Sequence, residues 1–187
     1  MGDTKMKKIS LKTKDNNLVS AEIVKLDKSD IKSILKLQDI IIEKLENKEL
    51  YAATNEEEFL DIIQNKGTII GVKTEEDALI AMGVFLKNNY DDHNYGYDIG
   101  ISGDDLLSVG QIESTVVLPN FRGNKLQQTI CEALENIAKE NNTKVITATA
   151  SPYNEFSVNT FLKLGYEIKA DKLKYGGLRR YVFAKNL

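Results

Sequence analysis

The stretch that decides the fold of this chain runs from Gln111 to Gln127 and reads QIESTVVLPNFRGNKLQ. Its first half, Ile112 to Leu118, is rich in β-branched residues and predicts a strand. A turn follows at Pro119-Asn120, and Arg122-Gly123 then opens a helix. The first N–H groups of a helix lack intrahelical partners, and the helix dipole there favours anions. A strand that passes through a glycine-containing loop into a helix therefore predicts a phosphate-binding geometry.

Length and composition indicate an ordinary soluble globular protein. The chain has 187 residues, of which 42% are hydrophobic and 28% are charged, and its formal net charge is −3. We expect one domain over residues 1–187, in which residues 1–17 are either flexible or an edge strand. The charge gives no basic field for nucleic acid, and no apolar run reaches membrane-spanning length. We therefore expect a cytoplasmic protein with no nucleic-acid or membrane partner.

The counts of cysteine and histidine narrow the available chemistry. Cys131 and His93 are the only residues of their kinds. An internal disulfide is excluded, and a Cys–His pair or a zinc site is disfavoured. We expect no metal, and we expect catalysis to rest on carboxylates, tyrosines, lysines, arginines or backbone groups.

Hydrophobic periodicity predicts the elements on either side of the central stretch. Strands are predicted over residues 18–26, 68–73, 78–85, 112–118, 144–150, 166–170 and 178–184. Helices are predicted over residues 30–45, 55–63, 122–141 and 157–164. Hairpins join antiparallel strands, whereas the helical crossover after residue 122 joins parallel ones. The order predicts an α/β (α+β) fold with a mixed, mostly antiparallel central sheet of about seven strands flanked by helices.

A series of residues after the loop extends the pattern. VVLPNFRGNKLQ is followed, one helix and one strand later, by Asn154, then Phe161, then Leu164-Gly165-Tyr166, and two strands close the chain. In order and spacing these features resemble the Gcn5-related N-acetyltransferase (GNAT) family, most strongly from Val109 to Leu187. The resemblance implies a GNAT-like acyl-CoA N-acyltransferase fold with acetyl-CoA as cosubstrate. It also implies acetyl transfer to a primary amine of a small molecule or protein, by direct attack in a ternary complex.

The resemblance further implies which residues hold the cofactor. The pantetheine arm would pair with the backbone of the strand, where an N–H near Val116 would polarise the thioester carbonyl. Asn154 either contacts the cofactor or caps a turn or helix. The residues implied in cofactor binding are Val116, Val117, Leu118, Arg122, Gly123, Asn124, Lys125, Leu126, Gln127 and Asn154.

The sequence departs from the family pattern at two places. Lys125 and Gln127 stand where the family commonly has small residues, and Lys125 could either limit backbone approach or contact the phosphates. Phe161 stands where many members have a tyrosine that protonates the departing thiolate. These departures support an alternative, a CoA-binding regulatory module that keeps the fold and lacks catalysis.

Glu113 is the candidate general base. Strand alternation predicts that it shares a face with Thr115 and Val117. A partly buried glutamate has a raised pKa that suits this work, although a surface residue or a lysine partner is the alternative interpretation. Tyr153 and Tyr166 are candidate acids, and each could instead belong to the core or the rim of the site.

The acceptor is not identified by the sequence. The acidic stretch from Asp91 to Asp105 could attract a cationic amine or be a solvated loop. Tyr90, Tyr95 and Tyr97 could line an acceptor pocket or anchor that loop. The oligomeric state is open, and a homodimer is one alternative.

Overall fold

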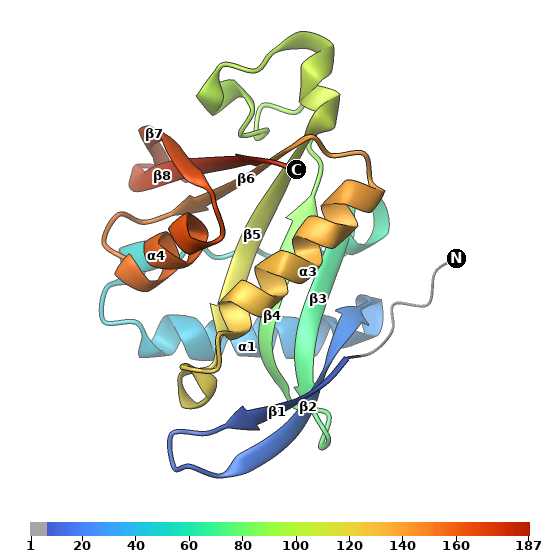
Figure 1. Cartoon of the computed structure of the whole chain (residues 1–187), viewed down its shortest axis with the longest axis vertical. Helices are drawn as coiled ribbons and strands as arrows, with labels where there is room; N and C mark the ends of the chain where they lie inside the picture. Colours follow the sequence, from blue (N-terminus) through green and yellow to red (C-terminus); the bar gives the residue numbers. More distant parts are fainter. Residues whose placement is uncertain (1–6) are drawn as a thin grey trace.

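One eight-stranded sheet runs through residues 7–187, the part of the chain that the computed structural model describes. Its strand order is β1-β2-β3-β4-β5-β6-β8-β7 (Figure 1). All neighbouring strands pair antiparallel except β5 and β6. The strands are β1 (Lys7–Lys12), β2 (Leu18–Leu26), β3 (Gly67–Thr74), β4 (Leu79–Leu86), β5 (Val109–Val117), β6 (Val145–Ala150), β7 (Glu167–Lys174) and β8 (Leu178–Asn186). The mixed, mostly antiparallel sheet is confirmed, and β1 brings it to one strand more than expected.

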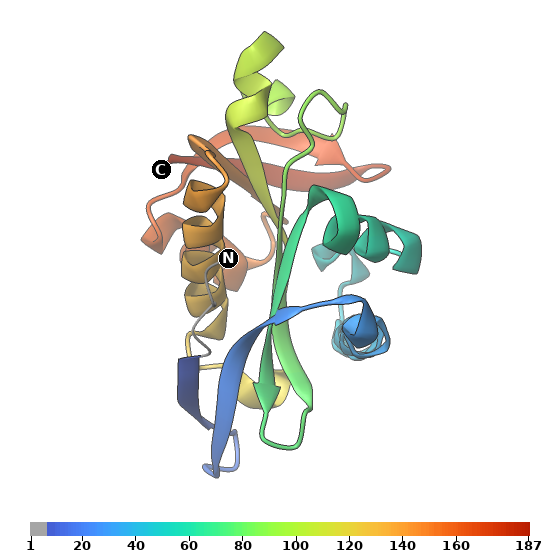
Figure 2. The same ribbon diagram turned by 90° about the vertical axis from the view of Figure 1, so that its right-hand side faces the viewer.

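Helices cover both faces of the sheet. Figure 2 shows α3 and α4 on one face and α1 and α2 on the other. Each face has its own core: Ile130 and Leu134 of α3 pack on the first, and Ile34 and Leu37 of α1 pack on the second. The helices are α1 (Ile31–Lys44), α2 (Glu56–Asp61), α3 (Leu126–Glu140) and α4 (Glu155–Lys163). Among residues 7–187, no helix is long and apolar enough to cross a membrane.

Several boundaries differ from the sequence prediction. Helix α3 begins at Leu126 rather than Arg122, because Gly123 (φ 91°) and Lys125 (φ 56°) both adopt left-handed backbone conformations that interrupt a helix. Helix α4 begins at Glu155, two residues early, because the Asn154 side chain accepts a hydrogen bond from the Ser157 N–H (3.2 Å) and caps it. The stretch before residue 18 contains β1 at the edge of the sheet, and residues 1–6 lie outside the described part.

Strands β5 and β6 separate along their length. They pair in parallel from Val109–Val145 to Ile112–Ala148. β5 then continues to Val117, while β6 pairs with β8 on its other side. Within the described chain, the second half of β5 therefore has no strand partner on the side toward β6. This open edge leads directly to the loop before α3.

A β-bulge lies in β5 at the point where the strands separate. Val84 pairs with Glu113 and Met82 with Val116, so two residues of β5 stand opposite one residue of β4. Ser114 adopts a left-handed φ of 49° at this bulge. The extra residue reverses the alternation: Val116 packs in the core under α1, whereas Val117 packs in the core under α3. Glu113, opposite Val84 of the α1-side core, shares a face with Val116.

The predicted face of Glu113 is therefore wrong. Thr115 accepts a hydrogen bond from Gln127 of α3 (3.2 Å), so it lies on the α3 side together with Val117. Glu113 lies on the α1 side. The prediction assumed an unbroken alternation, and a bulge of one residue shifts every later side chain to the other face.

Candidate active site

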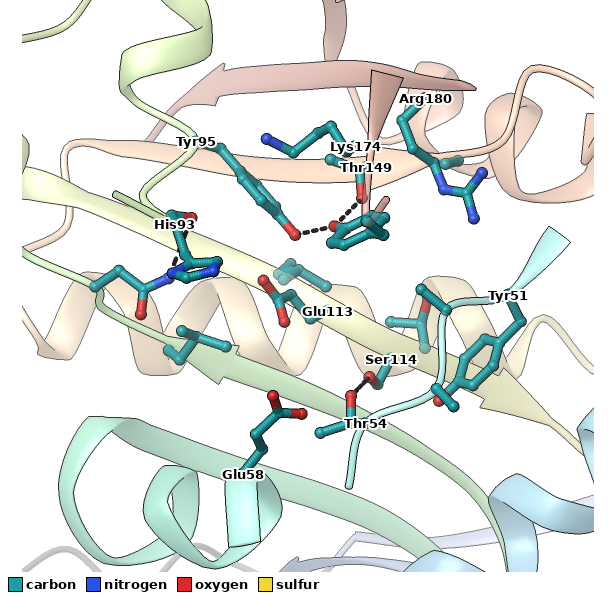
Figure 3. A pocket seen from close by; sticks show the side chains of 18 of the residues that line it. Tyr51, Thr54, Glu58, His93, Tyr95, Glu113, Ser114, Thr149, Lys174 and Arg180 are labelled. Carbon is teal, nitrogen blue, oxygen red and sulfur yellow. Dashed lines mark hydrogen bonds between the residues drawn. The ribbon is translucent and has the colours of Figure 1, made fainter. Parts of the chain in front are cut away.

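A cavity of about 680 Å³ opens where β5 and β6 separate. Its walls come from the second half of β5, the start of α4, the β7–β8 hairpin, the connector between α1 and α2, and the loop after β4. Figure 3 shows Glu113 in the middle of these walls, with Tyr95 on one side and Glu58 and Thr54 on the other. Glu113 alternates with Ile112, which packs in the α3-side core, so its side chain lies on the α1 side and lines the cavity.

Glu113 is half-buried and held by neighbours. Gln111 Nε2 donates to Glu113 Oε1 (2.8 Å), and Gln111 Oε1 in turn accepts from the Tyr95 N–H (2.9 Å). Loss of hydration raises the pKa of the Glu113 carboxyl, and hydrogen bonds from Tyr95 and Gln111 partly oppose this rise. The negative charge of Glu58 raises the same pKa further. A raised pKa makes the carboxylate a stronger proton acceptor, as a general base requires.

A chain of hydroxyl groups lies beside this carboxylate. The Tyr95 and Tyr175 hydroxyls hydrogen bond to each other, and Tyr175 also hydrogen bonds to Thr149 Oγ1 (2.9 Å). Desolvation raises the pKa of Tyr175 to about 12, and the negative charge of Glu113 adds to the effect. Burial likewise raises the pKa of Tyr95. Both phenols therefore carry their protons at neutral pH. Because their mutual hydrogen bond uses one of the two protons, one of them at a time can donate to a further group.

The three loop tyrosines divide between the two predicted roles. Tyr95 is 2% exposed and lines the cavity. Tyr90 and Tyr97 anchor the loop instead: the Tyr90 hydroxyl donates to Asp104 (2.8 Å), and the Tyr97 hydroxyl donates to the Tyr90 carbonyl (3.2 Å). The sequence did not single out Tyr175. The strand before it was predicted to end at residue 170, whereas β7 continues to Lys174 and carries Tyr175 to the cavity.

The two tyrosines proposed as acids lie elsewhere. Tyr166 is 2% exposed and packs edge-on against Phe161, with ring centroids 5.2 Å apart. Tyr153 is 59% exposed and lies outside the cavity walls. Because neither lines the cavity, we do not retain either as the acid. Phe161 reaches the cavity wall but is 1% exposed, and it packs against Phe183 as a core residue.

Side chains of the predicted cofactor loop hold the loop in place. Asn124 Oδ1 accepts from the Lys12 N–H (2.9 Å), and Asn124 Nδ2 donates to the Lys12 carbonyl (2.8 Å), which fastens the loop to β1. Gln127 Nε2 donates to Thr115 (3.2 Å) and Ser157 (3.0 Å), which joins β5, α3 and α4. Asn154 both caps α4 and lines the cavity.

Backbone N–H groups in the first turn of α3 have no acceptor within the helix. Lys125 occupies the N-cap position, and its side chain makes no capping hydrogen bond. The Thr129 N–H donates to the Lys125 carbonyl (3.0 Å), so the helical ladder begins there. The N–H groups of Leu126 and Gln127 precede this bond and can meet an anion at the positive end of the helix dipole. Lys125 adds a formal charge at the same place.

The strand register identifies which β5 donor faces the open edge. The Leu118 N–H donates to the Ile80 carbonyl of β4 (2.8 Å). Because successive N–H groups of a strand point to opposite edges, the Val117 N–H faces the open side and the Val116 N–H faces β4. Of these two N–H groups, that of Val117 is the one available to a carbonyl in the gap, next to the position near Val116 that the family resemblance implied.

The raised pKa of Glu113 predicts an effect on stability. Above that pKa, the wild-type fold holds a charge that folding has partly desolvated, so stability falls as the pH rises through it. Glu113→Gln keeps the acceptor oxygen for Gln111 and removes the charge. We expect the variant to be the more stable protein in urea unfolding at about pH 8, with the difference disappearing at about pH 4. A variant that is less stable at both pH values would contradict this.

The separated strands, the first turn of α3 and the cavity around Glu113 accompany a family match that makes the protein an acyltransferase. The chain belongs to the acetyltransferase (GNAT) family, whose model matches residues 33–166. This confirms the family that the sequence resembles. No curated protein matches the chain significantly.

Solved structures share the fold at low sequence identity. A protein named yncA from Salmonella typhimurium, solved with its cofactor acetyl-CoA, is 16% identical, with a TM-score of 0.65 over 89% of this chain and 93% of that one. An N-acetyltransferase from Staphylococcus aureus Mu50 is 17% identical, with a TM-score of 0.66 over 89% and 97%. A GNAT-family acetyltransferase from Streptococcus pneumoniae is 11% identical, with a TM-score of 0.67 over 89% and 99%.

Proposed function

We propose that this chain transfers an acetyl group from acetyl-CoA to a primary amine by direct attack in a ternary complex. The observation that carries the proposal is the position of Glu113, a carboxylate of raised pKa inside the cavity at the β5–β6 separation. Family membership supports acetyl transfer, and the presence of acetyl-CoA in the related yncA structure supports the choice of cosubstrate. The acceptor is an amine of a small molecule or a protein.

Acetyl-CoA would lie along the open edge of β5. Its pantetheine arm would pair with the backbone of Val116, Val117 and Leu118, like an added strand. Its pyrophosphate would meet the N–H groups of Leu126 and Gln127, with Lys125 and Arg122 close by in sequence to add charge. The Val117 N–H would donate to the thioester carbonyl oxygen as negative charge develops on it.

The reaction then needs one proton acceptor and one leaving group. Glu113 takes a proton from the ammonium of the acceptor, directly or through one water, and leaves a neutral amine. The amine nitrogen attacks the thioester carbon, a C–N bond forms, and the C–S bond breaks to release the CoA thiolate. An ordinary thiol has a pKa of about 8.5, so the thiolate can leave near neutral pH and take up a proton afterwards.

Phe161 favours a second candidate function, a CoA-binding regulatory module. The core packing of Phe161 leaves no hydroxyl at the position where many family members have a proton donor. Release of free thiol from acetyl-CoA across a panel of primary amines separates the two functions. Amine-dependent release supports the enzyme, whereas saturable acetyl-CoA binding without release for any amine supports the module.

The orientation of the β5 N–H groups predicts the effect of a proline at residue 117. Val117→Pro removes a donor that faces the open edge, so we expect the β4–β5 ladder to persist. We expect acetyl-CoA binding, measured by calorimetry, to weaken by about tenfold or more through loss of the pantetheine pairing. Val116→Pro is the matched control, because its N–H faces β4 and its loss should destabilise the fold instead. Unchanged acetyl-CoA affinity in a folded Val117→Pro variant would place the cofactor elsewhere.

A further inference from the structure

Some basic residues that line the cavity form ion pairs with carboxylates, and one does not. Lys66 pairs with Asp61 (3.0 Å), and Lys174 pairs with Asp98. Arg180 of β8 also lines the cavity, yet within residues 7–187 no carboxylate forms an ion pair with it. Arg180 is therefore the cavity cation whose counter-ion the described chain does not supply.

The Arg180 guanidinium is nevertheless buried and held in place. It is 3% exposed. Nη1 donates to the Arg179 carbonyl and Nη2 donates to the Glu49 carbonyl, each at 2.8 Å. Its Cζ atom lies 5.7 Å from the centre of the Tyr175 ring. Two of five donors are thus used on neutral oxygens, and the charge stays in place because a guanidinium is not deprotonated in proteins.

A buried charge without an ionic partner is costly, so its retention calls for an explanation. Backbone carbonyls fix the plane of the guanidinium, and the remaining N–H groups can form a fork for an anionic oxygen pair. Glu49 belongs to the connector between α1 and α2, so this fork lies on the α1 face, the face toward which Glu113 points.

The cavity wall carries a positive charge on one side of Glu113 and negative charges on the other. Figure 3 shows Arg180 and Glu58 on opposite sides of Glu113. Asp91 and Asp92 add further acidic groups to the lining. Tyr175 is coupled to both groups: its ring lies near the Arg180 guanidinium, its hydroxyl bonds to that of Tyr95, and the charge of Glu113 raises its pKa. An ammonium at Glu113 would therefore share the cavity with the Arg180 guanidinium.

We propose that the acceptor is an amine that also carries an anionic group, a carboxylate or a phosphate, which pairs with Arg180 while its ammonium faces Glu113. This inference rests on the proposed function and names the substrate class of the same site. A simple diamine or polyamine would satisfy the acidic wall but would leave Arg180 without a counter-ion.

Matched acceptors test the proposal with the acetyl-CoA-saturated enzyme. Free L-amino acids are compared with their primary amides, and O-phosphoethanolamine is compared with ethanolamine. We expect the anionic member of at least one pair to have a KM about ten- to hundredfold lower than its neutral partner. Arg180→Met should remove that preference by raising the KM of the anionic acceptor, and Arg180→Lys should restore part of it. The amino-acid and phosphate arms show which anion the site takes.

Arg179→Met is the control, because Arg179 is exposed on the same strand and pairs with Asp171. It should leave the preference unchanged. A second measurement applies if the protein binds CoA but shows no turnover. In it, the CoA-saturated protein is titrated calorimetrically with the same amino acids and with O-phosphoethanolamine. Binding that Arg180→Met abolishes supports the proposal. Neutral amines that react or bind as well as their anionic partners, or anionic binding that Arg180→Met leaves intact, would overturn it.

Discussion

Glu113→Gln is expected to lower kcat by about 10²- to 10⁴-fold, because glutamine fills the same space but cannot take the ammonium proton. The Gln111 hydrogen bond to the side-chain oxygen can persist, so acetyl-CoA binding should stay within about twofold of the wild type. The measurement is thiol release under saturating acetyl-CoA with an acceptor found in the amine panel. Calorimetry with acetyl-CoA gives the binding constant of the same variant.

The pH dependence adds a signature of the base. In the wild type, kcat/KM should fall as the pH drops through the raised pKa of Glu113, because the protonated carboxyl cannot act as a base. Glu113→Gln should lack this limb. Glu58→Gln is the matched control, since it removes a neighbouring cavity carboxylate whose charge raises the Glu113 pKa. It should move the limb to lower pH and leave kcat nearly unchanged. An unaltered rate in Glu113→Gln would remove Glu113 as the base.

Phe161→Ala is expected to lower the free energy of unfolding by about 3–5 kcal/mol, as truncations of fully buried aromatic rings do. The ring is 1% exposed and packs against both Tyr166 and Phe183, with centroids 5.2 Å away in each case. The measurement is urea unfolding of the variant and the wild type. Phe161→Leu leaves a smaller cavity and should lose clearly less. A loss below about 1 kcal/mol for Phe161→Ala would contradict the core role of this ring.

The sequence predicted elements well where a periodic pattern met a strong local signal. The spacing of apolar residues placed α1, whose buried face includes Ile34, Leu37 and Ile41. Asn55 marked the start of α2, where it forms a reciprocal capping pair with Glu58. The strand, loop and helix around Gly123 were predicted in the right order, because glycine and helix amphipathicity are both local features.

The site was less predictable because it depends on the bulge and on distant contacts. Ser114 carries no residue signal for a left-handed conformation, which glycine or asparagine would have given, so the reversed alternation after Glu113 could not be anticipated. Tyr95 and Tyr175 are 80 residues apart and meet only through the fold. Arg180 is one of five lysines and arginines among residues 172–187, and no local pattern separates it from the others. Its anchoring depends on the distant connector that supplies the Glu49 carbonyl.

Calorimetric titration of the wild-type protein with acetyl-CoA tests the central claim most directly, since every proposed role assumes that the cofactor lies along the open edge of β5. The predicted result is one molecule bound per chain with a Kd of about 1–100 µM. Absence of binding at about 1 mM acetyl-CoA would contradict both the transferase and the CoA-binding module.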